Sequence, residues 1–181
     1  KINGLPVGQH PEVCALLGGV FNTRPPQPRY VFIWDVQTVL DYIKSHWHNS
    51  SEISDKFLTF KVAMLMALVS ASRASAIHHL DVRFMVRGSN YYSFTFNKLH
   101  KSWIRGKPPP VLKFYAFPED AELCVVTTLD EYVKRTKSWR EVNEANQLLL
   151  GIPKPHVEVK PSTVSGWLKE MLKYTGIDVD T

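Results

Sequence analysis

The spacing of hydrophobic and polar residues predicts several helices interrupted by one small sheet. Residues 56–70 are apolar on nearly every side of a helix, which is typical of a central helix, and Ser54 or Asp55 is expected to begin it. A second helix is predicted over residues 36–43, because apolar residues recur there at helical spacing and Asp35 precedes them as an N-cap. These two segments form the first half of the predicted core.

Alternating residues of high β-propensity predict a three-stranded sheet after a short helix over residues 74–80. Residues 82–86 and 91–96 read as a hairpin around the turn that contains Gly88. A third strand is predicted over residues 111–117, after a run of three prolines that breaks the chain. The sheet is therefore expected to be antiparallel.

The last third of the chain is predicted to be helical again. One helical region is expected from Pro118 or Asp120 to about Trp139, supported by the i,i+4 pairs Asp130/Lys134 and Glu131/Arg135. The final helix is expected over residues 163–174, with Ser162 as its N-cap and Gly176 as its C′ residue. The element order predicts a mainly helical α+β fold, with helices around a small three-stranded antiparallel sheet.

The hydrophobic pattern also divides the chain into two parts. Residues 1–29 are rich in proline and glycine and read as an irregular connector or arm, with a short helix over residues 13–21 that Gly18-Gly19 would end. Residues 30–181 are expected to form one domain. The chain begins at Lys1 and stops shortly after a helix, so we expect it to be part of a longer protein.

Composition narrows the function classes. The net charge of +5 favours an anionic partner. Cys14 and Cys124 are the two cysteines and lie far apart, which argues against a zinc ribbon or disulfide framework and favours a reducing, intracellular location. No apolar run approaches the roughly 18 residues that a membrane span needs, so no membrane partner is expected.

Arg73 is the first candidate site residue. It lies between two apolar stretches, where a cation is costly to bury without an anionic partner, so we expect a semi-buried guanidinium beside an anion. The small residues that flank it leave room for a bulky anion such as phosphate. The alternative is a cation that merely complements the dipole at the C-terminus of a helix.

The segment after the second strand is the second candidate. Lys98, Lys101, Arg105 and Lys107 surround Trp103, and such interleaving of basic and aromatic residues suits a nucleic-acid backbone. The alternative is a solvated hairpin tip. Lys113 and Lys160 are further cations that we expect on a DNA-binding surface.

Other chemistries have little support. His78 and His79 are adjacent and are expected to point apart, so a packed or capping pair is the simpler interpretation than a metal site. His46 and His48 also lack helical ligand spacing. The sequence contains no carboxylate cluster typical of a two-metal nuclease, no P-loop and no GxSxG or GxGxxG motif, so we expect neither a metal nor another cofactor.

Taken together, these residues resemble the catalytic domain of tyrosine recombinases. The resemblance rests on Arg73 after a buried helix, a three-stranded sheet carrying lysine, and a helix introduced by residues 161–167, Pro-Ser-Thr-Val-Ser-Gly-Trp. Residues 24–30 and 98–102 are similar to the recombinases of DIRS-type retroelements and their animal genomic relatives. The resemblance covers about residues 30–181 and implies a nuclear protein that acts on double-stranded DNA, with a possible homo-oligomer on that DNA.

The resemblance also implies a metal-independent mechanism of DNA integration and recombination. In this family a tyrosine attacks the scissile phosphate and forms a 3′-phosphotyrosine. Arg73 matches the arginine that stabilises the phosphate in the transition state. Lys101, which Ser102 follows, matches the lysine that protonates the leaving 5′-oxygen better than Lys98 does, although Lys98 stays a candidate.

The sequence departs from the family pattern in two places. Ala76 stands where family members often carry an acidic residue. The His-x-x-Arg box and the nucleophilic tyrosine are expected after residues 176–178, but no histidine of these 181 residues begins such a box, and Tyr174 precedes its expected position. We therefore expect these residues to bind DNA without cleaving it. The alternatives are a domesticated, catalytically dead DNA-binding module and a helical protein-interaction module.

Overall fold

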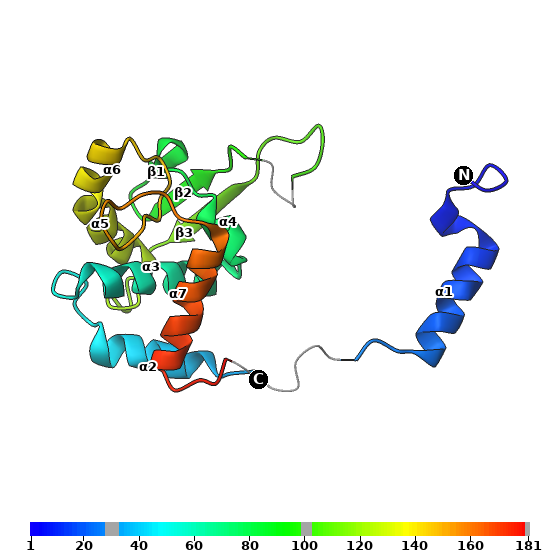
Figure 1. The fold of residues 1–181 in the computed structure, drawn as a ribbon, viewed down its shortest axis with the longest axis horizontal. Coiled ribbons are helices and arrows are strands. Elements are labelled where there is room, and N and C mark those ends of the chain that lie inside the picture. Colours follow the sequence, from blue (N-terminus) through cyan, green and yellow to red (C-terminus); the bar gives the residue numbers. More distant parts are fainter. Residues whose placement is uncertain (28–32, 99–102, 180–181) are drawn as a thin grey trace. The chain divides into compact units, whose positions relative to one another are not determined.

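The computed structural model describes residues 1–27, 33–98 and 103–179 (Figure 1). The chain divides into two compact units, Lys1–Trp34 and Asp35–Thr181. Each unit is described by itself.

The N-terminal unit contains a longer helix than the one expected over residues 13–21. A 3-10 turn over Val7–Gln9 leads into α1 (Pro11–Thr23), which continues through Gly18-Gly19. Proline at N1 suits a helix start, and a glycine costs only about 1 kcal/mol in a helix interior, which is not enough to end α1 here. None of the residues of α1 is buried, and Leu16 and Phe21 are largely exposed.

The second unit has the predicted mainly helical α+β fold. In chain order its elements are α2 (Val36–His46), α3 (Asp55–Ser70), α4 (Ala74–His78), β1 (Met85–Arg87), β2 (Tyr91–Thr95), β3 (Val111–Tyr115), α5 (Val125–Arg135), α6 (Lys137–Asn143) and α7 (Pro161–Tyr174). The helix α3 packs against α5, α7 and β3, and α4 packs against α3 and α7. Figure 1 shows α5 and α6 on one side of this unit and α4 on the other.

The predicted starts of α2 and α3 are confirmed. The Asp35 carboxylate accepts a hydrogen bond from the Gln37 amide at 2.9 Å, and the Ser54 hydroxyl accepts one from the Phe57 amide. All nine residues of 58–66 in α3 are buried, so this helix is central, as its apolar sequence predicts. The core of the unit forms where the other elements cover α3.

The sheet is antiparallel with the order β1-β2-β3, as predicted. Its first strand is shorter than expected because residues 82–84 form a 3-10 turn, in which the Asp81 carboxylate caps the Arg83 amide. The side chains of Phe94 and Phe114 are fully buried and contact each other edge to face across the sheet. The opposite face of β3, which carries Lys113, is exposed.

The helical region after β3 differs from the expectation. It starts at Val125, because the Asp120 carboxylate accepts hydrogen bonds from the amides of Glu122 and Leu123 and holds a turn there. Thr136 then separates two helices, α5 and α6.

One of the two predicted ion pairs of α5 forms. Glu131 binds Arg135 at 2.6 Å. Asp130 instead binds Arg87 of β1, which attaches the sheet to α5. The Nζ of Lys134 lies 3.9 Å from the carboxylate of Glu131, which precedes Lys134 by three residues.

The last helix, α7, begins two residues earlier than expected. Pro161 takes the N1 position and Lys160 the N-cap position, so Ser162 lies inside the helix and does not cap it. Gly176 has a φ of 79°, which confirms it as the residue that ends the helix. In the described part of the chain, no helix has both the length and the apolar character that crossing a membrane requires.

Candidate nucleic-acid interface

Arg73 lies at the start of α4, after a sharp turn of the chain. Ala71 ends α3 in the left-handed region with a φ of 48°, and the Ser70 hydroxyl accepts a hydrogen bond from the Ser72 amide. Arg73 then takes the N-cap position, where its carbonyl accepts bonds from the amides of Ala76 and Ile77. The small residues around it make this turn possible.

The side chain of Arg73 is exposed, so the expectation of a semi-buried guanidinium was wrong. An exposed guanidinium keeps its contact with water and does not incur the cost of burying a charge. No described residue forms an ion pair with its guanidinium.

The other end of α4 is tied to the segment that leads into α7. The His78 imidazole bonds the Val159 carbonyl through Nε2 at 2.9 Å. The buried Gln147 side chain donates to the His78 carbonyl and accepts from the Val159 amide, at 2.8 and 2.7 Å. These bonds hold Lys160, which follows Val159, close to the end of α4.

Lys98 lies beside the same end of α4. It is exposed and lines a polar cavity of about 160 Å³ together with His78, His79, Asp81 and Arg83. Arg73 and Lys98 therefore flank one short helix, and five residues of α-helix rise only about 7–8 Å. Lys101, the preferred family lysine, lies outside the described residues, as do His100 and Ser102.

The other predicted cations occupy different places. Arg105 and Lys107 are exposed between β2 and β3, and the Trp103 indole donates to the Lys107 carbonyl at 3.1 Å, which closes a turn. Lys113 lies on the outer face of the sheet, where its Nζ is 5.4 Å from the centre of the Tyr91 ring.

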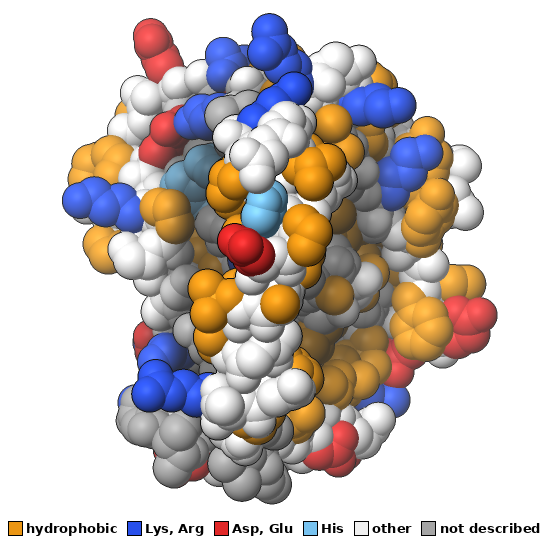
Figure 2. All heavy atoms as spheres, turned by 90° about the vertical axis from the view of Figure 1, so that its right-hand side faces the viewer, with side chains coloured by type: hydrophobic (Ala, Val, Ile, Leu, Met, Phe, Trp, Pro, Cys, Tyr) orange, Lys and Arg blue, Asp and Glu red, His pale blue; other side chains and the backbone are white. Residues whose placement is uncertain are grey.

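The basic side chains do not form a uniform surface. Figure 2 shows Lys and Arg side chains at separate places, among hydrophobic and acidic ones. A local cluster of cations can hold a phosphate, whereas a mixed surface gives weaker attraction at long range.

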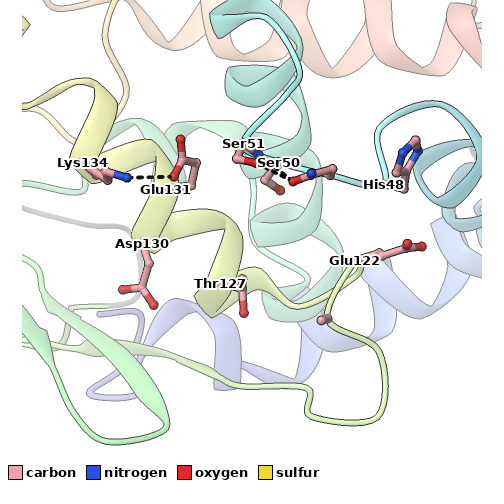
Figure 3. Close-up of a pocket in the computed structure, with 10 residues that line it drawn as sticks. His48, Ser50, Ser51, Glu122, Thr127, Asp130, Glu131 and Lys134 are labelled. Carbon is pink, nitrogen blue, oxygen red and sulfur yellow. Dashed lines mark hydrogen bonds and ion pairs between the residues drawn. The ribbon is translucent and has the colours of Figure 1, made fainter.

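A larger cavity, of about 610 Å³, lies elsewhere in this unit and is acidic. Figure 3 shows Asp130, Glu131 and Lys134 on α5, Glu122 on the connection before α5, and Ser50 on the connection between α2 and α3. It has three carboxylates against one lysine, whereas in the cavity beside Lys98 the carboxylates Asp81 and Glu158 are matched by Arg83 and Lys98, so we do not assign the nucleic-acid interface to the larger cavity.

Two carboxylates of these cavities, Asp130 and Asp81, are held in the ionised form. Burial by itself raises the pKa of Asp130, but hydrogen bonds from Arg87 and Tyr92 outweigh it and lower the pKa. Burial also raises the pKa of Asp81, but hydrogen bonds with Arg83 and Asn97 outweigh this effect, so the pKa of Asp81 is lowered too. Both groups thus carry a negative charge at neutral pH.

The histidine pair differs from the expectation. The rings of His78 and His79 do not point away from each other. They are in edge-to-face contact, with 4.7 Å between their centres. Within the described ranges, no three His, Cys, Asp or Glu side chains are arranged to hold a metal ion.

Comparison with known proteins supports the fold. No protein-family model matches this sequence, and no curated protein matches it. The structure is similar to that of the XerH site-specific recombinase, solved in a pre-cleavage complex with its difH substrate. The TM-score is 0.54 at 11% sequence identity, and the match covers 99% of this chain and 51% of XerH. This chain has a recombinase-like fold and spans about half the length of that relative.

Sequence reasoning missed the residues that organise the surroundings of α4. Asp81, Asn97 and Gln147 form its connections to the sheet and to the segment before α7, together with His78, for which a packed or capping role was expected. The only local signal was Asp81, two residues before Arg83, which is the spacing of a capped turn. The bonds of Gln147 and Asn97 join distant parts of the chain and could not be predicted from spacing.

Proposed function

We propose that this chain is a DNA-binding part of a site-specific tyrosine recombinase or integrase. The observation that carries the proposal is the pairing of Arg73 and Lys98 at the two ends of α4, in a fold similar to that of a recombinase. Two cations beside one short helix can bind nearby phosphates of the same DNA backbone, because every nucleotide of a strand carries one.

Arg73 is the residue that we propose to bind the scissile phosphate. It is exposed and its guanidinium forms no ion pair with a described residue, so its planar fork is available for two phosphate oxygens. In the complete reaction, this contact would strengthen as negative charge develops on the phosphate. Lys98 or Lys101 would donate the proton to the leaving 5′-oxygen.

Arg105, Lys107 and Lys160 are proposed to hold the flanking DNA backbone. Arg105 and Lys107 lie on the exposed connection between β2 and β3, and Lys160 lies at the start of α7. Contacts of this type add affinity without sequence preference. The nucleophile and the His-x-x-Arg box are not among these 181 residues, so the proposed role is binding and positioning of DNA.

The proposal predicts salt-sensitive binding of duplex DNA. The double variant Arg105→Glu/Lys107→Glu should weaken binding about tenfold or more for all sequences alike, because two phosphate contacts become repulsive. Fluorescence anisotropy with labelled duplexes over a range of salt concentrations measures both the affinity and its salt dependence.

A matched control separates a local contact from a change in net charge. Lys134→Glu/Lys137→Glu makes the same charge change on α5 and α6, where both side chains are about 80% exposed. This variant should bind DNA nearly as well as the unchanged chain. Equal losses in the two double variants would contradict the proposed surface, and absence of salt-dependent binding would favour a protein-interaction module.

A second candidate function is a catalytically inactive DNA-binding module. Ala76, which is 4% exposed, occupies the position where the family often has an acidic residue. A methyl group there cannot accept a hydrogen bond from a neighbouring catalytic group. The inactive module is the better assignment if two results hold. Ala76→Glu leaves DNA binding unchanged, and longer chains that contain this segment do not cleave DNA.

A further inference from the structure

The Asp81 carboxylate is the most extensively bonded acidic group near α4. Its side chain is 8% exposed and receives 2.9 and 3.1 Å hydrogen bonds from the backbone amide and Nε of Arg83. Nη2 of Arg83 adds a third at 2.7 Å, and Nδ2 of Asn97 adds a fourth at 3.2 Å. A carboxylate with four donors has a single well-defined orientation.

Asp81 is itself fixed to the body of the unit. On one side of it, the Leu80 carbonyl accepts a hydrogen bond from the Leu148 amide at 2.8 Å. On the other side, the Val82 amide donates to the Asn146 carbonyl at 2.9 Å. The carboxylate therefore projects from a backbone segment that is held on both sides, only three residues after α4.

The bond to Asn97 connects this anchor to the end of β2. Asn97 is the residue immediately before Lys98, and Lys98 lines the polar cavity that Asp81 and Arg83 also line. A lysine side chain has four rotatable bonds, so the direction of its backbone decides which region its ammonium can reach. Fixing Asn97 sets that direction next to the end of α4.

We propose that Asp81 is a positioning residue that holds the start of the β2–β3 connection, through Asn97, so that Lys98 faces the DNA phosphate beside α4. This inference rests on the proposed DNA-binding function and adds to it the requirement that Lys98 be held in position. The carboxylate acts through Lys98 and does not touch the DNA itself. Without it, Lys98 would sample a wider range of positions and contact the phosphate less often.

A double-mutant cycle between Asp81 and Lys98 tests this role. Lys98→Ala should weaken duplex binding about fivefold to tenfold at 0.1 M salt and lower the slope of log affinity against log salt by about 1, the effect of one lost phosphate contact. Asp81→Asn should give a similar loss. In the Lys98→Ala background, Asp81→Asn should have less than about a twofold effect, because its loss acts through Lys98.

Asn97→Ala provides a second route if Asp81→Asn does not fold. It removes the bond to Asp81 and leaves the pair between Asp81 and Arg83 in place. The same dependence on Lys98 is expected. Thermal unfolding of each variant measures stability separately from DNA binding.

Asp130→Asn is the matched control. Asp130 also binds an arginine, Arg87, and a sheet residue, Tyr92, but it lies at the acidic cavity and away from Lys98. This variant should lower the melting temperature without changing the salt slope of DNA binding. A salt slope that falls equally in both Asp→Asn variants would overturn the inference.

The double-mutant cycle also distinguishes failure of the proposed DNA-binding site from failure of the proposed role of Asp81. If Lys98→Ala leaves affinity and salt slope unchanged, the proposed binding site is wrong. If Lys98→Ala weakens binding and Asp81→Asn causes its full loss of affinity in the Lys98→Ala background as well, the proposed binding site is supported. Asp81 is then not the residue that positions Lys98.

Discussion

At the scale of single residues, Lys61 lies in the centre of α3 and forms no ion pair with a carboxylate of the described residues. Its side chain is completely buried. The ammonium donates to the Trp47 carbonyl at 2.6 Å and to the Ser50 hydroxyl at 3.0 Å, and thus holds the connection between α2 and α3. Burial lowers the pKa of Lys61 from 10.5 to about 8, although Glu122 and Asp120 act in the opposite direction.

The lowered pKa predicts an unusual dependence of stability on pH. Between pH 8 and 10.5 the unfolded chain keeps the Lys61 proton and the folded chain loses it, so the contribution of this group to stability rises with pH. The free energy of unfolding of the unchanged chain should therefore increase relative to that of Lys61→Met over this range. Urea unfolding at pH 7, 9 and 10 measures the difference.

Lys134→Met serves as the control for this pH experiment, because Lys134 is 81% exposed. The difference in unfolding free energy between this variant and the unchanged chain should show no comparable rise between pH 8 and 10. A difference for Lys61→Met that stays constant with pH would mean that the ammonium keeps its ordinary pKa inside the fold.

At the scale of elements, two serines near helix starts have different roles. Ser54 caps α3 through the Phe57 amide, whereas Ser162 lies at the second position of α7, after Pro161. Proline has no amide hydrogen and fits the first helical position, so it moves the helix start before Ser162. The N-cap of α7 is then Lys160, which forms no capping bond with its side chain.

The same substitution at both serines should give different results. Ser54→Ala should lower the free energy of unfolding by about 1 kcal/mol, because the Phe57 amide loses its acceptor. Ser162→Ala should change it by less than about 0.5 kcal/mol. Chemical denaturation of the two variants measures both values, and an equal loss at the two positions would show that Ser162 does cap α7.

At the scale of the whole molecule, every buried residue of the described chain belongs to the second unit. The first of them in the chain is Val39, and α1 contains none. Hydrophobic burial is the main favourable term in folding, so residues 35–181 contain what a stable fold requires.

A chain of residues 35–181 is therefore expected to fold on its own. Its thermal unfolding, followed by circular dichroism, should be a single cooperative transition. A broad transition without cooperativity would show that the described core is not sufficient. The m-value in urea should match the surface expected for a domain of this length.

The sequence by itself determined the features that depend on local physics. The apolar run of α3, the N-caps Asp35 and Ser54, the antiparallel hairpin and the ending of α7 at Gly176 all follow from propensity, spacing and capping within a few residues. For the same reason Arg73 and Lys98 could be selected as candidate residues, because their positions relative to the predicted elements are visible in the chain.

Only the tertiary structure decided which groups meet. Asp130 binds Arg87, 43 residues before it in the chain, in place of the lysine one helical turn away. Asp81 reaches Asn97, and Gln147 joins α4 to the segment before α7. Arg73, expected to be semi-buried, is exposed at the start of α4. Such contacts depend on how distant elements pack, and local spacing carries no information about that packing.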